Sequence, residues 1–188
     1  MSKPTTYVAL LRGINVGGNN LISMTDLKAC VEQLGHRRVR TYINSGNVIF
    51  QSASTDPRQL EAALETALAP RFKAPIAVVA RSHAEMQRTL AHVPAGWLTA
   101  DDLRRYVIFL RHTIDHPELV ERFTFKPEIE ALTYAPGTLF WSVRLESVTK
   151  SSLSKQLMGR AVFQDMTMRN LNTLQKLCAL MDEMDGAT

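Results

Sequence analysis

Apolar runs and amphipathic stretches alternate along the first 80 residues and predict six elements. An apolar, β-rich run is followed by residues at helical spacing, then by two short strand-like runs around "NSG", a second amphipathic stretch and a last apolar run. The predicted order is strand, helix, strand, strand, helix, strand, which is the ferredoxin-like arrangement. The expected elements are 6–13, 23–35, 38–43, 47–51, 56–72 and 75–80.

Helix-capping residues support both predicted helices. Ser23 with Asp26 suits the start of the first helix, and Gly35 suits its end. Asp56 is a good N-cap for the second helix, and Pro57 fits its first turn. Capping residues and hydrophobic periodicity therefore support the same helix boundaries.

The second half of the chain echoes this pattern. A helix is expected over 82–91, a connector over 93–102, a strand over 104–111 and a short helix over 116–123. A hairpin (128–135 and 138–146), a helix (151–158), a strand (161–166) and a final helix (170–184) follow. The sequence thus predicts an α+β fold of two ferredoxin-like halves in tandem, with antiparallel sheets and helices on one face. The expected domains are 1–80, a helix and connector over 81–104, and 105–188.

Ferredoxin-like topology brings three loops of the first half to one end of its sheet. These loops are 13–20 after the first strand, the hairpin tip 44–47, and the turn 71–75 before the fourth strand. Asn and Ser present both donors and acceptors, and glycines allow backbone N–H groups to approach a ligand. The candidate ligand-binding residues are Arg12, Gly13, Asn15, Gly17, Gly18, Asn19, Asn44, Ser45, Gly46, Asn47, Arg71 and Lys73, with three cations and no carboxylate.

The leading hypothesis is that these loops, 13–20 and 44–47, bind a small anionic or nucleotide-like ligand. The alternative is turn chemistry alone, because Asn and Gly also adopt left-handed turn conformations and bond their own backbone. The three glycines of the first loop, Gly13, Gly17 and Gly18, fit neither the G-x-G-x-x-G pattern nor the P-loop pattern. The resemblance to phosphate sites is therefore one of composition.

Two predicted helix starts are weaker candidates for anion binding. The first spans 150–155, and the second includes Arg169 and Asn170. Ser, Thr and Asn are also ordinary N-caps, so both readings stay open. A Ser-x-x-Lys match from Ser152 to Lys155 lacks the accompanying motifs of a serine nucleophile.

Charge favours the first half as an anion-attracting surface. The net charge of the 188 residues is +4; residues 1–80 carry nine Lys/Arg against five Asp/Glu, whereas 81–188 carry thirteen of each. A nucleic-acid-binding module using this basic half is one alternative function, although Tyr7 and Phe50 are expected in the core rather than as stacking residues. A non-catalytic interaction module is another.

Composition gives further expectations. No apolar run approaches the roughly 20 residues of a membrane span, so no membrane partner and a cytoplasmic location are expected. Cys30 and Cys178 lie in helical apolar stripes and are expected to be buried thiols.

Neither a metal site nor a reaction stands out. Pro117 pushes His116 into an extended conformation, so His116 and His112 do not form a helical ligand pair. Asp101 and Asp102 beside two arginines suggest a charge-balanced turn. Catalytic residues, cofactor and oligomeric state stay open.

Three segments carry a family resemblance. The motifs "YVALLRGINVGGNN", "RTYINSGNVIF" and "TMRNLNTLQKL" resemble the bacterial family known as domain of unknown function 1697. The resemblance implies two ferredoxin-like halves and no established activity. Two departures are Leu171, where the family usually has Trp, and "KSSLSKQL" in place of a Gly-x-Ser-Lys-Leu-like segment. The first two motifs coincide with the loops that the topology brings together.

Overall fold

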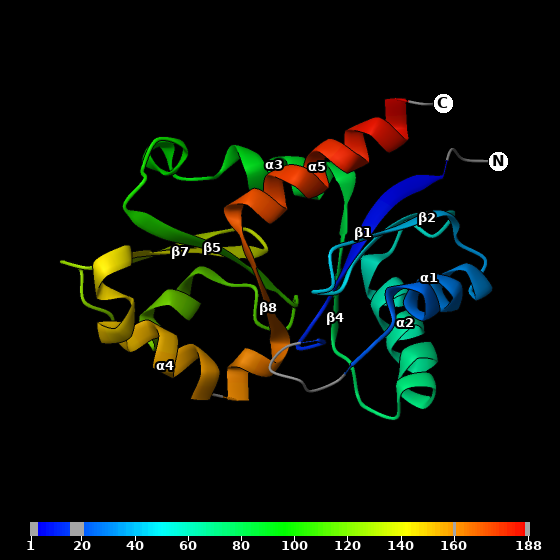
Figure 1. The fold of residues 1–188 in the computed structure, drawn as a ribbon, viewed down its shortest axis with the longest axis horizontal. Helices are drawn as coiled ribbons and strands as arrows, with labels where there is room; N and C mark the ends of the chain where they lie inside the picture. The colour runs from blue at the N-terminus through cyan, green and yellow to red at the C-terminus, as the bar shows by residue number, and fades with distance from the viewer. Residues whose placement is uncertain (1–3, 16–20, 160, 187–188) are drawn as a thin grey trace. The chain divides into compact units, whose positions relative to one another are not determined.

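A computed structural model describes residues 4–15, 21–159 and 161–186 of the chain (Figure 1). Its first sheet contains four strands in the order β2-β3-β1-β4, and every neighbouring pair is antiparallel. The strands are β1 (Thr5–Leu11), β2 (Arg37–Tyr42), β3 (Asn47–Ser52) and β4 (Val78–Ser82). With α1 (Met24–Gln33) between β1 and β2 and α2 (Pro57–Phe72) between β3 and β4, this is the predicted ferredoxin-like topology.

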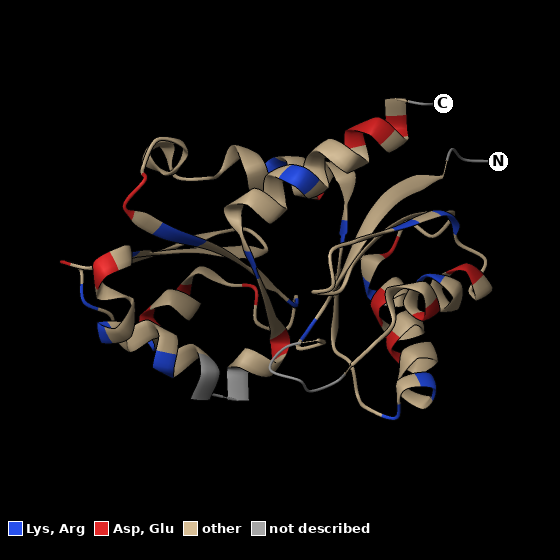
Figure 2. Ribbon diagram, in the orientation of Figure 1, with Lys and Arg blue, Asp and Glu red and all other residues tan. Residues whose placement is uncertain are grey.

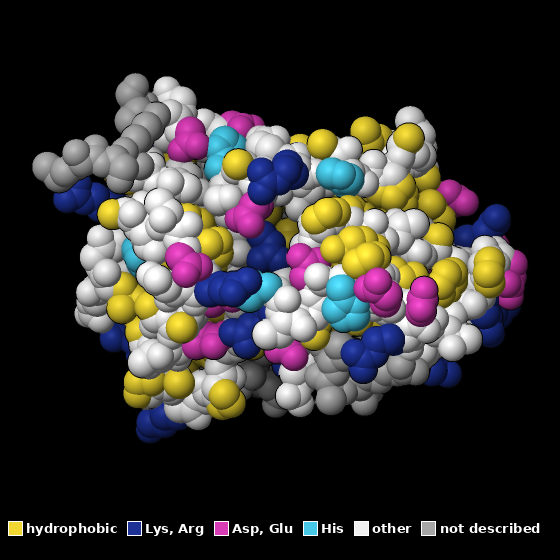
Figure 3. Space-filling model, turned by 180° about the vertical axis from the view of Figure 1, so that it is seen from behind, with side chains coloured by type: hydrophobic (Ala, Val, Ile, Leu, Met, Phe, Trp, Pro, Cys, Tyr) yellow, Lys and Arg dark blue, Asp and Glu magenta, His cyan; other side chains and the backbone are white. Residues whose placement is uncertain are grey.

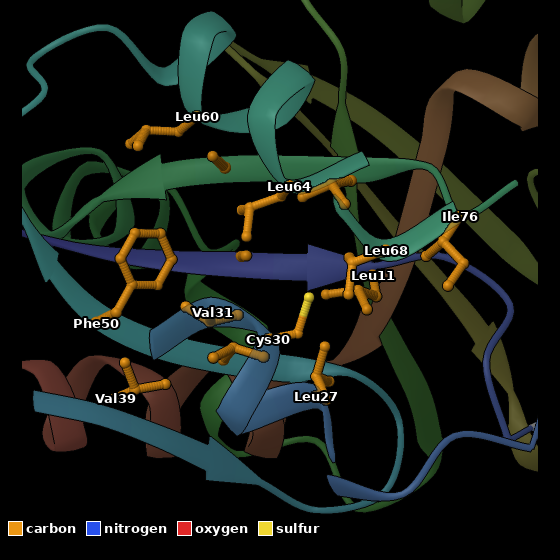
Figure 4. Packing of buried hydrophobic residues seen from close by; sticks show 14 of the residues in the cluster. Leu11, Leu27, Cys30, Val31, Val39, Phe50, Leu60, Leu64, Leu68 and Ile76 are labelled. Atoms are coloured by element: carbon orange, nitrogen blue, oxygen red, sulfur yellow. The ribbon is translucent and has the colours of Figure 1, made fainter. Parts of the chain in front are cut away.

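Helices α1 and α2 cover one face of the first sheet (Figure 4). Their apolar stripes contribute Cys30 and Val31 from α1 and Leu64 from α2, and these pack against strand residues such as Phe50 and Leu11. Period-2 alternation along β1 places Tyr7, Ala9 and Leu11 in this cluster. Tyr7 and Phe50 stack with ring centroids 6.2 Å apart, so their predicted place in the core is confirmed.

The predicted N-caps of α1 and α2 form. Ser23 Oγ accepts from Asp26 N at 3.3 Å, and Asp56 Oδ1 accepts from Arg58 N at 2.9 Å. Both thiols are buried as expected, with Cys30 4% and Cys178 1% exposed. Burial raises the pKa of each thiol, that of Cys178 to about 12, which keeps both in the unreactive protonated form.

The second sheet repeats the first in the order β6-β7-β5-β8, again fully antiparallel. Its strands are β5 (Leu103–Leu110), β6 (Glu130–Ala135), β7 (Thr138–Arg144) and β8 (Met166–Asn170). Helix α4 (Ser152–Gly159) contributes Leu153 and Leu157 to the core of this sheet. The predicted α+β fold with two ferredoxin-like halves is therefore confirmed.

Two predicted elements of the second half differ in the structure. The segment expected as a short α-helix over 116–123 is a 3-10 helix, η2 (Pro117–Arg122), and His116 before it is extended as Pro117 requires. The strand expected over 161–166 is instead a 3-10 turn, η4 (Ala161–Asp165), and β8 begins only at Met166. Further 3-10 turns are η1 (Ala95–Leu98) and η3 (Leu145–Lys150).

The chain divides into two compact units, residues 1–87 with 176–188 and residues 88–175. This division differs from the expected one, because α3 (His83–Ala91) begins in the first unit and most of α5 (Leu171–Gly186) belongs to it. Side-chain contacts within the first unit explain the difference. Arg38 Nη1 donates to Met184 O at 2.6 Å, and Arg40 pairs with Glu183 at 3.1 Å.

Candidate functional site

Three loops of the first unit converge at the end of the sheet where β1 terminates. Leu11 N donates to Gly46 O of the hairpin at 2.8 Å, and Arg12 N donates to Ala77 O at 2.9 Å, just before β4. The loop after β1, the β2–β3 hairpin and the turn before β4 are thus neighbours, as the topology predicts.

Asn15 ties the loop after β1 to the hairpin. Its Nδ2 donates to Asn44 O at 2.9 Å and to Ile22 O at 3.0 Å, and its Oδ1 accepts from Ile22 N at 2.7 Å. Its backbone is left-handed, with φ 54°, a conformation that Asn tolerates better than most residues. The Asn15 amide is therefore used in holding two loops together, and its predicted contact with a ligand stays a prediction.

A hollow of about 500 Å³ lies beside this tie. It is lined by Asn15, Asn44 and the four residues 21–24, which lead into α1. Within the described part of the chain, the amide groups of Met24 and Thr25 make no hydrogen bond, as expected for the first turn of a helix. The hollow therefore combines an exposed amide side chain with backbone donors.

Ser45 and Asn47 shape the hairpin from inside. Asn47 is fully buried, and its Nδ2 donates to Tyr42 O at 3.0 Å and to Ser45 Oγ at 3.1 Å. Neither residue lines the hollow. A contact between Asn47 and a ligand would require the hairpin to open.

Gly13 and Gly46 both have positive φ, at 64° and 78°. A Cβ on Gly46 would lie 2.8 Å from side-chain atoms of Leu11 and Ile14, whereas one on Gly13 would meet nothing within 4 Å. The positive φ alone explains why a glycine occupies position 13. At position 46 both the positive φ and the close packing require a glycine.

The cations at this end are not isolated from carboxylates. Arg71 Nη2 lies 3.3 Å from Asp26 Oδ1 in the first turn of α1, so the expectation of a carboxylate-free cluster is wrong. The sequence predicts only a capping role for Asp26, because 45 residues separate it from Arg71. Lys73 is exposed and ends α2 in a left-handed conformation, with φ 54°. The predicted site residues Gly17, Gly18 and Asn19 lie outside the described residues.

The two candidates from the C-terminal motif have structural partners. Arg169 is 7% exposed, and its Nη1 donates to Thr167 Oγ1 at 2.9 Å and to Met168 O at 2.8 Å. Burial lowers the pKa of its guanidinium to about 10. Asn170 Oδ1 accepts from Thr173 N at 2.8 Å and so caps α5, while its exposed side chain lines a second pocket, in the second unit.

The anion at the start of α4 is a side chain of the protein itself. The carboxylate of Glu130, 3% exposed, accepts from Ser151 Oγ at 2.5 Å, from Ser152 Oγ at 2.9 Å and from Ser152 N at 3.2 Å. Burial opposes ionisation of Glu130, but these bonds, with those from the amides of Lys126 and Leu153, hold its pKa below the ordinary value. The sequence indicated an anion site over 150–155 but not this occupant, which lies 21 residues away.

Several basic residues of the first unit lie beside acidic groups. Besides Arg71, Arg40 pairs with Glu183, and the buried Arg81 lies 4.0 Å from Glu61. Figure 2 shows red and blue segments together on α1 and α2, and Figure 3 shows both signs interspersed over the face it presents. These arrangements give the nucleic-acid alternative no concentrated basic patch on that face.

Metal binding and membrane insertion are two further possibilities that the structure addresses. Among the residues it describes, no cluster of three His, Cys, Asp or Glu side chains could hold a metal ion. In the same residues, no helix is both long enough and apolar enough to cross a bilayer.

Comparison with known proteins extends the family resemblance. The family model described as "Protein of unknown function (DUF1697)" matches residues 5–140. A conserved bacterial protein, SP0830 from Streptococcus pneumoniae, is 29% identical with a TM-score of 0.83, covering 95% of this chain and 99% of its own. An unknown protein from Galdieria sulphuraria is 13% identical over 89% of this chain and 98% of its own, but its TM-score of 0.27 supports no inference.

No curated protein matches the chain. The match of the family model covers well over half of the sequence and includes both N-terminal motifs. Together with the shared fold of the pneumococcal protein, it shows that the chain belongs to the protein family of unknown function 1697.

Proposed function

We propose that the protein binds a small ligand with an anionic group, such as a nucleotide or phosphorylated metabolite, in the hollow beside Asn15 and Asn44. The observation that carries the proposal is the position of this hollow over the start of α1. Its volume of about 500 Å³ falls within the roughly 300–1,000 Å³ common for small-molecule sites.

Backbone and side-chain donors would bind the anionic group. The amides of Met24 and Thr25 point out of the first turn of α1, where the helix dipole favours negative charge. The exposed Asn44 side chain adds an amide donor and acceptor. Leu21, 77% exposed, offers an apolar surface for the remainder of the ligand.

Arg71 would act indirectly. Its ion pair with Asp26 compensates the one carboxylate in the first turn of α1. Loss of the Arg71 charge would leave Asp26 to repel an anion at the helix start. This role differs from the direct contact that the sequence suggested, and Asn15 likewise would hold the wall of the hollow in place.

A thermal-shift panel of nucleotides and phosphorylated metabolites tests the proposal, followed by titration of the hits. Asn44→Ala should weaken binding by about tenfold, because a charge-assisted hydrogen bond is lost. Its effect on stability should be small, since Asn15 bonds the backbone carbonyl of Asn44, which this change retains. Leu21→Glu should abolish binding by placing a negative charge at the rim.

Arg58→Gln is the matched control for Arg71→Gln, because both residues lie on α2 and Arg58 is exposed, without an ion pair among the described residues. Arg71→Gln should weaken binding and Arg58→Gln should not. If no compound shifts the melting temperature, or if all hits survive Asn44→Ala and Leu21→Glu, the hollow is not a binding site.

A further inference from the structure

A second cavity lies entirely within the second unit, where α5 leaves the sheet. Strand β8 pairs with β5 only as far as Asn170, opposite Tyr106, and the chain then turns directly into α5. Strand β5 extends three residues further, to Leu103, so no strand pairs with it there on the β8 side. The result is a cavity of about 280 Å³ lined by residues 103–106 and 170–172.

The lining of this cavity carries positive charge. It includes Arg104 and Arg105 and the amides of Asn170 and Asn172, and it has no carboxylate. Within the described chain, neither arginine forms an ion pair, although Asp101 and Asp102 precede them, so the expected charge-balanced turn contains no direct pair.

The donors of the cavity are partly fixed in place. Arg105 Nη1 donates to Trp97 O, which holds the side chain while leaving other guanidinium N–H groups. Asn170 uses its Oδ1 to cap α5, which leaves its NH₂ group as a donor. Arg104 is exposed and makes no hydrogen bond to another described residue.

The first unit shows what occupies the corresponding position there. Strand β4 ends at Ser82 opposite Tyr7, as β8 ends at Asn170 opposite Tyr106, and α3 follows β4 directly as α5 follows β8. Here the Asp185 carboxylate accepts from Thr6 Oγ1, and its other oxygen lies 2.6 Å from His83 Nδ1.

By strand register, Thr6 corresponds to Arg105 and His83 corresponds to Leu171. In the first unit, the Asp185 carboxylate therefore occupies the position that corresponds to the cavity of the second unit.

We propose that the cavity of the second unit binds a small carboxylic acid, with Arg104 and Arg105 as its charge partners and Asn170 and Asn172 as further donors. The volume of about 280 Å³ lies just below the range for drug-sized ligands, which favours a ligand of few carbons. This site is separate from the hollow of the first unit, so each can fail without the other.

Titration of the whole chain with succinate, followed by NMR at constant ionic strength, tests the proposal. Chemical shifts of residues 103–106 and 170–172 should move and saturate, and uncharged succinamide should leave them unchanged. Arg104→Gln should weaken succinate binding roughly tenfold or more. This variant removes no contact within the described residues, so it should fold like the wild type.

Arg58→Gln on the first unit removes the same charge from an exposed arginine and should leave binding unchanged. Asn44→Ala should also leave it unchanged, which separates the two sites. Equal responses to succinate and succinamide, shifts outside the named residues, or unchanged affinity in Arg104→Gln would each overturn the proposal. A stronger response to inorganic phosphate than to succinate at these residues would also overturn it.

Discussion

Asn15 and Asp115 perform the same task in the two units with opposite chemistry. Asn15 follows β1 and Asp115 follows β5, and each side chain forms a hydrogen bond with the next hairpin of its unit. Asn15 donates to Asn44 O at 2.9 Å, whereas Asp115 Oδ1 accepts from Gly137 N at 2.8 Å and from the Tyr134 hydroxyl at 2.9 Å. A neutral amide therefore borders the hollow of the first unit, and a carboxylate lies at the corresponding end of the second.

At the other end of each sheet, where β1 or β5 begins, the carboxylate lies in the first unit and the concave surface lies in the second. Asp185 occupies the end of the first sheet where β1 begins, and the second sheet has its arginine-lined cavity where β5 begins. Each unit thus has an acidic side chain at one end and a concave surface at the other. The two units share their topology, and the placement of a few carboxylates distinguishes their chemistry.

The largest effect is expected at the hairpin of the first unit. Gly46→Ala combines a positive φ of 78° with close contacts of 2.8 Å to Leu11 and Ile14. It should lower the free energy of unfolding by about 3–5 kcal/mol. Gly35→Ala has a similar φ of 84° but open space, and should cost only ~1–2 kcal/mol. Similar losses in urea unfolding would contradict the role assigned to packing around Gly46.

Helix starts offer a second contrast between the units. Glu130→Ala removes the buried carboxylate that bonds the start of α4, and should cost about 3 kcal/mol. Asp56→Ala removes only the local cap of α2, and should cost about 1 kcal/mol. Denaturant unfolding of both variants at pH 7 measures the difference, and a larger loss in Asp56→Ala would reverse the comparison.

Glu130 also predicts a dependence of stability on pH. Its pKa is lowered in the folded protein from the ordinary 4.5, so its contribution is complete above that value. The contribution is lost as the pH falls from about 4.5 through the folded pKa. Glu130→Gln should therefore flatten this part of the stability curve, and an unchanged slope would argue against the lowered pKa.

Exchanging the amide of Asn15 for a carboxylate, and the carboxylate of Asp115 for an amide, should lower the free energy of unfolding by smaller and unequal amounts. Asn15→Asp replaces an NH₂ donor with an oxygen facing the carbonyls of Ile22 and Asn44, and should cost about 2–3 kcal/mol. Asp115→Asn keeps an acceptor for both of its donors, and should cost about 1 kcal/mol. Equal losses of stability in the two variants, measured by thermal or urea unfolding, would show that the choice between amide and carboxylate is not what stabilises these contacts.

Tyr134 provides a spectroscopic check on the second tie. Burial, together with the hydrogen bond and negative charge of Asp115, raises the pKa of its phenol to about 12. Asp115→Asn should lower that pKa, which ultraviolet titration of the tyrosines would detect. Tyr134→Phe identifies the signal, and a late-titrating group that persists in this variant would belong to another tyrosine.

A small effect on stability is also expected at Asp185. Asp185→Gly should lower stability by about 1–2 kcal/mol, because the side chain is partly exposed, and should open a place for a free carboxylate. Millimolar acetate should restore part of the melting temperature of this variant and leave that of the wild type unchanged. Chloride at equal ionic strength is the control, and equal recovery in chloride would break the proposed equivalence of the two ends.

Sequence periodicity predicted most of the fold because the responsible signals are local. Alternation in β1, apolar stripes in α1 and α2, and caps at Ser23 and Asp56 each depend on neighbouring residues. The segment 161–166 misled the prediction because its β-rich residues carry no signal of the 3-10 turn that precedes β8. Tertiary context decided that segment.

Candidate sites were less predictable because their chemistry depends on distant partners. Topology correctly brought Asn15 beside Asn44, but the pairing of Arg71 with Asp26 and the burial of Glu130 under Ser151 join residues 21 to 45 positions apart. The arginine-lined cavity follows from where β8 stops relative to β5. Strand register to the residue cannot be deduced from the patterns of single segments.

The place of α5 also has a consequence for synthesis of the chain. Residues 176–188 belong to the same compact unit as residues 1–87, but they are translated after the whole of residues 88–175. At roughly 5–20 residues per second, the intervening segment 88–175 delays them by roughly 4–18 s. During that interval Arg38 and His83 have been synthesised but their partners Met184 and Asp185 have not, so the unit that contains β1 is completed only after residues 88–175 have been made.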